Sequence, residues 1–272
     1  LEHAGGFLTI RGIKVFYDGS LGSRTAVLAQ PYADAHDLAA PAERITPERI
    51  VELGQRAAPT GFQLAVHAIG DEGNRRVLES FATALADHPE VDHRWRIEHA
   101  QVVTPEFFAD AKRLGVIASM QPSHAVGDSD WAEARLGPER VSRAYAWRTM
   151  LEAGIPLIFN SDLPGEPWTP MQTLYFAVTR QKLDGTPEGG WKPEQRVTTQ
   201  EALQAMTRSS AYAAFAEDRL GTLAPGYKAD FVVVDRNPLE SEPAQLKDIR
   251  VLETWVDGKR VWSQGDPLDA KR

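Results

Sequence analysis

The feature that most constrains the fold of this chain is a repeated alternation of two kinds of segment. Five short apolar runs have the length and the β-branched or aromatic content of strands buried on both faces. They span residues 13–17, 63–67, 95–99, 116–121 and 157–162. Amphipathic stretches with helix-boundary residues separate them. Strand followed by helix, several times over, is typical of an α/β fold built on a parallel sheet.

The residues between these runs are those expected at helix boundaries. The predicted helices begin at Thr46-Pro47-Glu48, at Asp71 and at Thr104-Pro105-Glu106, and they stop at His88-Pro89 and at Gly115; a further helix over 141–153 ends at Gly154. Thr198 and Glu201 form a capping box that predicts a helix running to about Ala216.

In the C-terminal part of the chain, the apolar residues recur with a period of two. Strands are predicted over 231–235 and 251–256, and Asp257-Gly258 is the turn of a β-hairpin. A small β domain is therefore expected to begin near Arg219. The predicted domains are a (β/α) portion over 1–218 and part of a β-sandwich over 219–272.

A polar side chain ends each of four apolar runs. These residues are His67, His99, Gln121 and Asp162. A (β/α)8 barrel uses about 30 residues per strand–helix unit and carries its active site at the carboxyl ends of the strands. His67 and His99 are 32 positions apart, and Asp162 lies 63 positions further on. The pattern predicts a shared site, and imidazoles with a carboxylate favour a divalent ion such as Zn²⁺.

Lys14 lies inside the apolar run 13–17, where an inward ammonium without a partner is costly. Three interpretations stay open from the pattern alone. The side chain reaches solvent from an edge strand, or a desolvated amine forms a Schiff base with a carbonyl substrate. In the third, a neutral amine captures carbon dioxide and becomes a carbamate that binds metal.

The composition excludes several classes of function. The chain has no cysteine, which excludes disulfides, cysteine-ligated metals and thiol nucleophiles. Its formal charge of −8 and the lack of a basic run argue against nucleic acid as a partner. No apolar stretch approaches the roughly 20 residues of a membrane span. We expect a cytoplasmic protein that acts on a small-molecule substrate.

Six stretches resemble the amidohydrolase superfamily, in the branch that includes N-substituted formamide deformylases. They read GIKVFYDGSLGSRTA, LAVHAIGD, RIEHAQ, MQPSHA, FNSDLPGEPW and GTLAPGYKADFVVVD, and a terminal VDGKRVW hairpin follows them. The resemblance implies a metal-dependent hydrolase on a distorted (β/α)8 barrel with a small β-sandwich.

The resemblance also implies roles for individual residues. Lys14 is similar to the carboxylated lysine of barrel strand 4, and His67 and His99 are similar to the ligands of strands 5 and 6. Asp162 is similar to the strand-8 aspartate that contacts metal and shuttles the proton. The implied substrate contacts are His124, Arg24 and Gln121.

One family motif is missing from this sequence. The superfamily normally carries His-x-His on barrel strand 1, but the seven histidines here stand at positions 3, 36, 67, 88, 93, 99 and 124. The chain also begins with Leu1 instead of Met. We therefore expect a truncated barrel (strands 4–8), a C-terminal half that would need its N-terminal half or a second copy of itself.

The predicted activity is hydrolysis of amide or formamide C–N bonds by a metal-activated water, with one or two Zn²⁺ ions. In that mechanism Asp162 is the proton carrier. The alternatives are a Schiff-base lyase that uses Lys14, a half-barrel that serves as an assembly or binding subunit, and an inactive fragment.

Overall fold

The computed structural model describes residues 2–3, 8–164 and 169–265, and it divides into two compact units. The first unit comprises Leu1–Met120 and Asp128–Leu157, and the second comprises Gln121–Gly127 and Ile158–Arg272. The domain boundary predicted at 218/219 lies inside the second unit and stays a prediction. Within the described residues, no helix has the length and apolarity needed to cross a bilayer.

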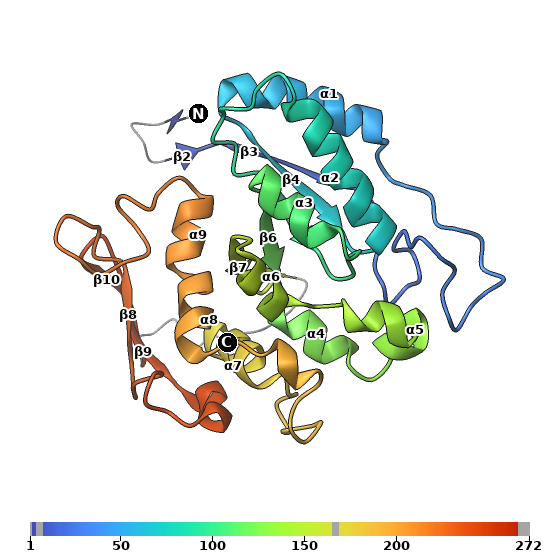
Figure 1. Ribbon diagram of the computed structural model, residues 1–272. Helices are drawn as coiled ribbons and strands as arrows, with labels where there is room; N and C mark the ends of the chain where they lie inside the picture. Colours follow the sequence, from blue (N-terminus) through green and yellow to red (C-terminus); the bar gives the residue numbers. More distant parts are fainter. Residues whose placement is uncertain (1, 4–7, 165–168, 266–272) are drawn as a thin grey trace. The chain divides into compact units, whose positions relative to one another are not determined.

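Five strands form one sheet in the order β3-β4-β5-β6-β7 (Figure 1). They are β3 (Gly12–Phe16), β4 (Gln63–Ala68), β5 (Arg96–His99), β6 (Ile117–Met120) and β7 (Leu157–Phe159). The pairs from β3 to β6 are parallel. The predicted α/β fold with a parallel sheet is confirmed, and all five predicted strands are present. Closure into a barrel stays a prediction.

The strands differ in burial. Every residue of β4 is buried. β3 stands at one end of the strand order, and its residues alternate between exposed and half-buried. The N-terminal residues add a two-stranded antiparallel pair, β1 (Glu2–His3) with β2 (Leu8–Thr9).

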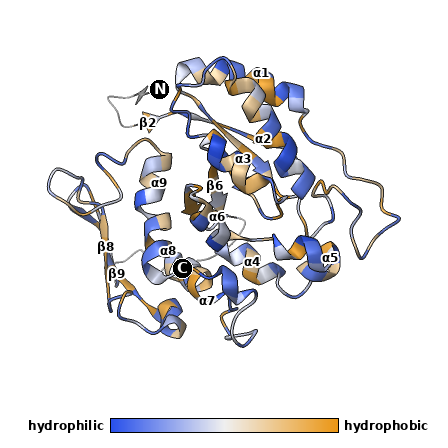
Figure 2. Cartoon of the chain, viewed as in Figure 1, coloured by the Kyte–Doolittle hydropathy of each residue, from blue (hydrophilic) through white to orange (hydrophobic). Residues whose placement is uncertain are grey.

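Helices follow the strands of the first unit. The predicted ones are α1 (Pro47–Ala57), α2 (Asp71–Leu85) and α3 (Phe107–Leu114), and the unit also contains the 3₁₀ turn η2 (Ala58–Thr60), α5 (Ala132–Ser142) and α6 (Trp147–Ala153). α1 and α2 pack side by side, and Figure 2 shows hydrophobic and hydrophilic residues alternating around them. Trp95 is fully buried between them, with its ring 5.1 Å from that of Phe81. Thr46 caps α1 as predicted.

The single helix predicted over 141–153 is wrong. Two helices, α5 and α6, stand in this region, and the chain between them leaves helical geometry at Tyr145, which has φ 52°. The reason is long-range pairing. Ala144 forms a bridge with Val102, and the N–H of Tyr145 donates to the carbonyl of Gln101 at 2.7 Å. These main-chain bonds to the segment after β5 replace about one turn of helix, residues 143–146.

The second unit contains helices and an antiparallel sheet. The elements are α4 (Pro122–Asp128, whose last residue belongs to the first unit), α7 (Pro170–Thr179), η3 (Pro193–Gln195), α8 (Thr199–Met206), α9 (Arg208–Ala213), β8 (Phe231–Val234), η4 (Pro243–Asp248), β9 (Val251–Val256) and β10 (Lys259–Ser263). The strand order is β10-β9-β8. The predicted hairpin is confirmed, because β9 and β10 pair across Asp257 and Gly258, which both have positive φ.

The capping box predicted for the helix of the second unit is confirmed, but the helix is shorter than predicted. Thr198 and Glu201 exchange both capping bonds at the start of α8. The chain then breaks at Thr207, with φ −122° and ψ −82°, before α9 begins. The break coincides with a close crossing of the chain. A Cβ at Gly221 would lie 2.9 Å from the Cα of Arg208.

Candidate functional site

Two of the predicted metal ligands lie in contact at the carboxyl ends of neighbouring strands. The rings of His67 and His99 are 4.4 Å apart, and both side chains are buried. The register pairs Ala68, and not His67, with His99, so regular pleating would place the rings on opposite faces. The left-handed backbone of His99 (φ 81°) ends that regularity. Such strain in a non-glycine residue is typical of functional sites.

Main-chain and side-chain oxygens surround one nitrogen of His67. Its Nε2 lies 2.9 Å from the carbonyl oxygen of Gly19 and 3.4 Å from Oδ1 of Asp18. A carbonyl oxygen only accepts hydrogen bonds, so Nε2 carries the hydrogen. In the neutral ring Nδ1 is then the basic nitrogen, the one that can bind a metal.

Asp18 is fully buried and was not predicted as a site residue. Its carboxylate accepts main-chain hydrogen bonds from Val27 at 2.9 Å, Ile69 at 3.0 Å and Gly70 at 2.9 Å. Burial raises the pKa of Asp18 to about 6, although the three N–H donors act in the opposite direction. A sequence signal was present, since Asp18 is the polar residue that directly follows the apolar run 13–17.

Lys14 differs from the expectation of a buried amine. The residue is exposed on the edge strand β3, and its Nζ lies 4.2 Å from the centroid of the Phe16 ring. The ring of Phe16 also lies 5.1 Å from that of His67, measured between ring centroids. An exposed amine on an edge strand matches the first of the three interpretations. The role of Lys14 as a carboxylated ligand stays a prediction.

The second unit brings together three further predicted residues, Asp162, His124 and Gln121. Oδ2 of Asp162 lies 3.9 Å from Nε2 of His124 on α4. Nε2 of Gln121 donates to Oδ1 of Asn160 at 2.9 Å, and the N–H of Asp162 donates to the same oxygen at 3.1 Å. Asn160 therefore connects Gln121 to Asp162. It was missed, although it is the polar residue that follows the buried strand β7.

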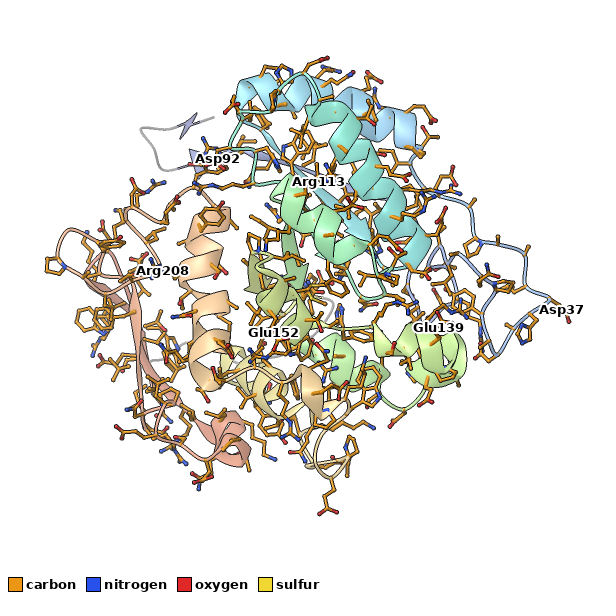
Figure 3. All side chains as sticks on the ribbon, in the orientation of Figure 1. Asp37, Asp92, Arg113, Glu139, Glu152 and Arg208 are labelled. Carbon is orange, nitrogen blue, oxygen red and sulfur yellow. The ribbon has the colours of Figure 1, made fainter. Side chains whose placement is uncertain are left out.

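Arg24 makes a structural ion pair. Its guanidinium donates two hydrogen bonds to Asp34, at 3.1 and 2.8 Å, and Arg135 donates to the same carboxylate at 3.0 Å. The pairing raises the pKa of Arg24. Arg24 and Asp34 both lie in the long segment between β3 and α1, and Asp37 stands at the tip of that segment (Figure 3). The predicted contact of Arg24 with substrate stays a prediction.

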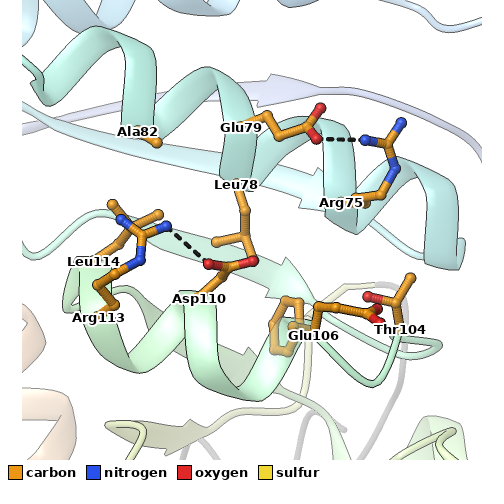
Figure 4. Close-up of a pocket in the computed structure, with 10 residues that line it drawn as sticks. Arg75, Leu78, Glu79, Ala82, Thr104, Glu106, Asp110, Arg113 and Leu114 are labelled. Atoms are coloured by element: carbon orange, nitrogen blue, oxygen red, sulfur yellow. Dashed lines mark hydrogen bonds and ion pairs between the residues drawn. The ribbon is translucent and has the colours of Figure 1, made fainter.

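Each unit contains a cavity among the described residues. The one between α2 and α3 is about 80 Å³, and the ion pairs Arg75–Glu79 and Arg113–Asp110 line it (Figure 4). It has room for a few water molecules. The cavity in the second unit is about 410 Å³, within the range of small-molecule pockets. Its lining residues are Ser123, Val126, Gly127, Phe176, Lys182, Leu183 and Asp184.

The donor set supplies part of a metal site. His67 and His99 are two neutral-imidazole donors held against each other, and His67 has an outer hydrogen-bond partner of the kind that orients metal-binding histidines. Residues 2–3, 8–164 and 169–265 contain no group of three or more His, Cys, Asp or Glu side chains that could hold a metal. The pair fits a divalent ion only with a further ligand.

Comparison with known proteins places this arrangement in a family. The chain is 35% identical over 257 residues to Protein LONG AFTER FAR-RED 3 of Arabidopsis thaliana, covering 94% of this chain and 43% of that protein. It is 29% identical over 211 residues to the N-substituted formamide deformylase of Arthrobacter pascens, covering 76% and 38%. A solved metal-dependent hydrolase of Pyrococcus horikoshii superposes with a TM-score of 0.78 at 33% identity, covering 89% and 48%.

The chain thus spans less than half the length of each of these three proteins. The family model for the Amidohydrolase family matches residues 2–262, nearly the whole chain. The parallel sheet and the paired histidines at its carboxyl edge agree with that match. The chain belongs to the amidohydrolase family.

Proposed function

We propose that this chain forms part of a metal-dependent hydrolase that cleaves amide-type C–N bonds of a small molecule. The observation that carries the proposal is the buried contact between His67 and His99, with Nε2 of His67 bonded to a carbonyl oxygen. The descriptions of two similar proteins, a metal-dependent hydrolase and a formamide deformylase, support it. A cytoplasmic location remains part of the proposal.

In this proposal His67 and His99 hold a divalent ion, Zn²⁺ in one or two copies, with carboxylated Lys14 and Asp162 as further ligands. When bound, such an ion lowers the pKa of water from about 15.7 toward 7 and polarises a carbonyl group. A second ion would require ligands from outside the His67–His99 pair.

The proton is carried by a residue of the second unit. Asp162 accepts it at a carboxylate oxygen as water attacks the substrate carbonyl, and then returns it to the leaving nitrogen. His124, whose Nε2 lies 3.9 Å from that carboxylate, donates a hydrogen bond to the developing oxyanion. Gln121, held by Asn160, and Arg24 contact the substrate.

The test replaces Asp162 by Asn in the complete enzyme. We expect kcat to fall by about 10²- to 10⁴-fold, the usual contribution of a general acid–base group. Asp218→Asn is the matched control, because Asp218 is also an exposed carboxylate of the second unit, lines neither cavity and accepts from the adjacent Arg219 at 3.2 Å. Turnover by Asp162→Asn equal to that of the control would refute the role of Asp162.

The metal is tested separately by elemental analysis. His99→Asn should lose bound zinc, while His36→Asn, a change at an exposed loop histidine, should keep it. Equal zinc content in the two variants would refute the proposed metal site without reference to any substrate.

A second proposal concerns assembly, and the edge strand β3 supports it. Leu8, Ile10 and Phe16, on and before this strand, are each about half exposed, at 49%, 48% and 50%. A strand edge with apolar neighbours is a surface on which another strand pairs. We propose that an N-terminal half or a second copy of the chain covers it. A monomer in light scattering at every concentration tested would exclude the second copy.

A further inference from the structure

We propose that Asp18 is the positioning residue of His67, which it holds in one ring orientation and in the tautomer that carries hydrogen on Nε2. The inference adds a residue to the proposed site, and only its consequence for metal binding rests on the proposed function. Asp18 itself touches no reacting group in this scheme. It acts through the main chain that follows β4 and through its own carboxylate.

The carboxylate of Asp18 fixes the segment that follows His67. Ile69 and Gly70 come directly after β4, and their N–H groups donate to the two oxygens of Asp18 at 3.0 and 2.9 Å. Val27, from the segment after β3, donates to one of the same oxygens at 2.9 Å. Asp18 is fully buried, so no water replaces these bonds. The carboxyl ends of β3 and β4 are therefore joined through one side chain.

The ring of His67 meets two acceptors on the same side. Nε2 lies 2.9 Å from the carbonyl oxygen of Gly19 and 3.4 Å from Oδ1 of Asp18. The opposite tautomer would direct the lone pair of Nε2 at both oxygens, an arrangement that is repulsive and leaves a buried acceptor without its donor. Asp18 and the adjacent carbonyl thus favour the same tautomer.

The carbonyl of Gly19 cannot turn away from the ring. The N–H of Gly19 donates to the carbonyl of Thr25 at 2.9 Å, and the N–H of Ser20 donates to Oγ1 of Thr25 at 3.0 Å. A Cβ at position 19 would lie 1.9 Å from that Oγ1, so only glycine fits. The loop is closed on itself, and its carbonyl is presented to His67.

The test compares Asp18→Asn with Asp71→Asn. Asp71 is a second buried carboxylate of the first unit, and its Oδ1 accepts hydrogen bonds from the N–H groups of Ala29 and Glu72, both at 2.9 Å. Its replacement removes the same charge without touching His67. Long-range ¹H–¹⁵N NMR of the metal-free 272-residue chain reports the tautomer of each histidine.

We expect His67 of the wild type to be in the Nε2–H form. In Asp18→Asn the ratio of the Nε2–H to the Nδ1–H form should fall by about tenfold, because the negative charge that lies 3.4 Å from Nε2 is removed. Asp71→Asn should leave the ratio unchanged. An unchanged ratio in Asp18→Asn overturns the proposal. The wild-type spectrum is a test that needs no variant, because a predominant Nδ1–H form overturns the proposal as well.

Zinc affinity separates this inference from the proposed function. Loss of a residue that orients a metal ligand typically weakens metal binding by 10- to 100-fold, so Asp18→Asn should weaken zinc binding by that factor and Asp71→Asn should not. A wild-type chain with the Nε2–H tautomer but no zinc binding would refute the metal site and leave the role of Asp18 supported. If Asp18→Asn leaves the zinc affinity unchanged, the expected effect of Asp18 on metal binding is overturned.

Discussion

Asn74→Asp should destabilise the first unit in a pH-dependent way, because Asn74 acts as a buried donor. The side chain is fully buried on α2, and its Nδ2 donates to the carbonyls of Ala68, Gly70 and Val102 at 3.2, 2.8 and 3.0 Å. It thereby joins the ends of β4 and β5. A carboxylate of the same shape would direct an oxygen at three carbonyl oxygens.

The magnitude follows from the protonation state that the buried acid must adopt. A protonated carboxyl keeps one donor and loses the other, which costs about 1–2 kcal/mol. Keeping it protonated costs about 1.4 kcal/mol for each pH unit above the ordinary Asp pKa of about 3.9, roughly 4 kcal/mol at pH 7 and 1.5 kcal/mol at pH 5. The expected loss of unfolding free energy is therefore about 5–6 kcal/mol at pH 7 and about 3 kcal/mol at pH 5.

The direction of the pKa change determines whether the loss of stability grows or shrinks with pH. The new carboxyl has a higher pKa in the folded than in the unfolded chain, so its penalty grows as pH rises above about 3.9. Urea unfolding followed by tryptophan fluorescence measures it, since Trp95 and Trp147 are both fully buried in the first unit. Asn237→Asp is the control. Asn237 is exposed and accepts from the N–H of Leu239, which a carboxylate also does.

The control should change stability by less than about 0.5 kcal/mol at either pH, as usual for surface substitutions. A loss in Asn74→Asp that is equal at pH 5 and pH 7 would show that the buried amide does not act as the donor described here. A loss below about 1 kcal/mol at pH 7 would have the same meaning.

The remaining predictions concern backbone space and one ion pair. Gly70→Ala should cost at least about 2 kcal/mol in urea unfolding, because its Cβ would lie 2.0 Å from the main-chain oxygen of Val27. Gly127→Ala, in α4 with nothing within 4 Å of the added Cβ, should instead stabilise by about 0.5–1 kcal/mol; a loss there would contradict the helical assignment. Hydrogen bonding to Arg75 lowers the pKa of Glu72 to about 2. The ionised Glu72 therefore makes its full contribution to the free energy of unfolding above about pH 4.5, and this contribution is lost as pH falls toward 2. Relative to wild type, Glu72→Gln should lose about 1 kcal/mol at pH 6 and almost nothing near pH 2, a small value because solvent screens the pair; a pH-independent difference would refute this linkage.

Local signals in the sequence were sufficient for much of the fold. The strands β4 and β6 are short apolar runs in which every residue is buried, and such burial on both faces of a parallel sheet is readable from residue type alone. The hairpin at Asp257-Gly258 was readable for a different local reason, since positive φ restricts which residues can occupy such a turn. The positions of His67 and His99 at strand ends followed from the same pattern.

In other regions hydrophobic periodicity does not indicate the observed structure, although α7 does begin with a capping box at Thr169 and Gln172. Seven consecutive residues of α7, from Thr173 to Thr179, are buried, so this helix has no polar face and therefore no amphipathic period. The segment 143–146 has helix-forming residues, but the bond from Tyr145 to the carbonyl of Gln101 ends the helix. In both cases the deciding contacts are made by residues remote in sequence.

The chemistry of the site divides in the same way. Residue type and spacing determined that His67 and His99 would stand at the ends of neighbouring strands, because side-chain period and strand length are local properties. Tertiary structure alone decided that Nε2 of His67 meets the carbonyl of Gly19 beside the buried carboxylate of Asp18, and that Lys14 is exposed at the sheet edge. Hydrogen-bond partners and burial depend on chain segments dozens of residues away, and only the folded chain brings those segments together.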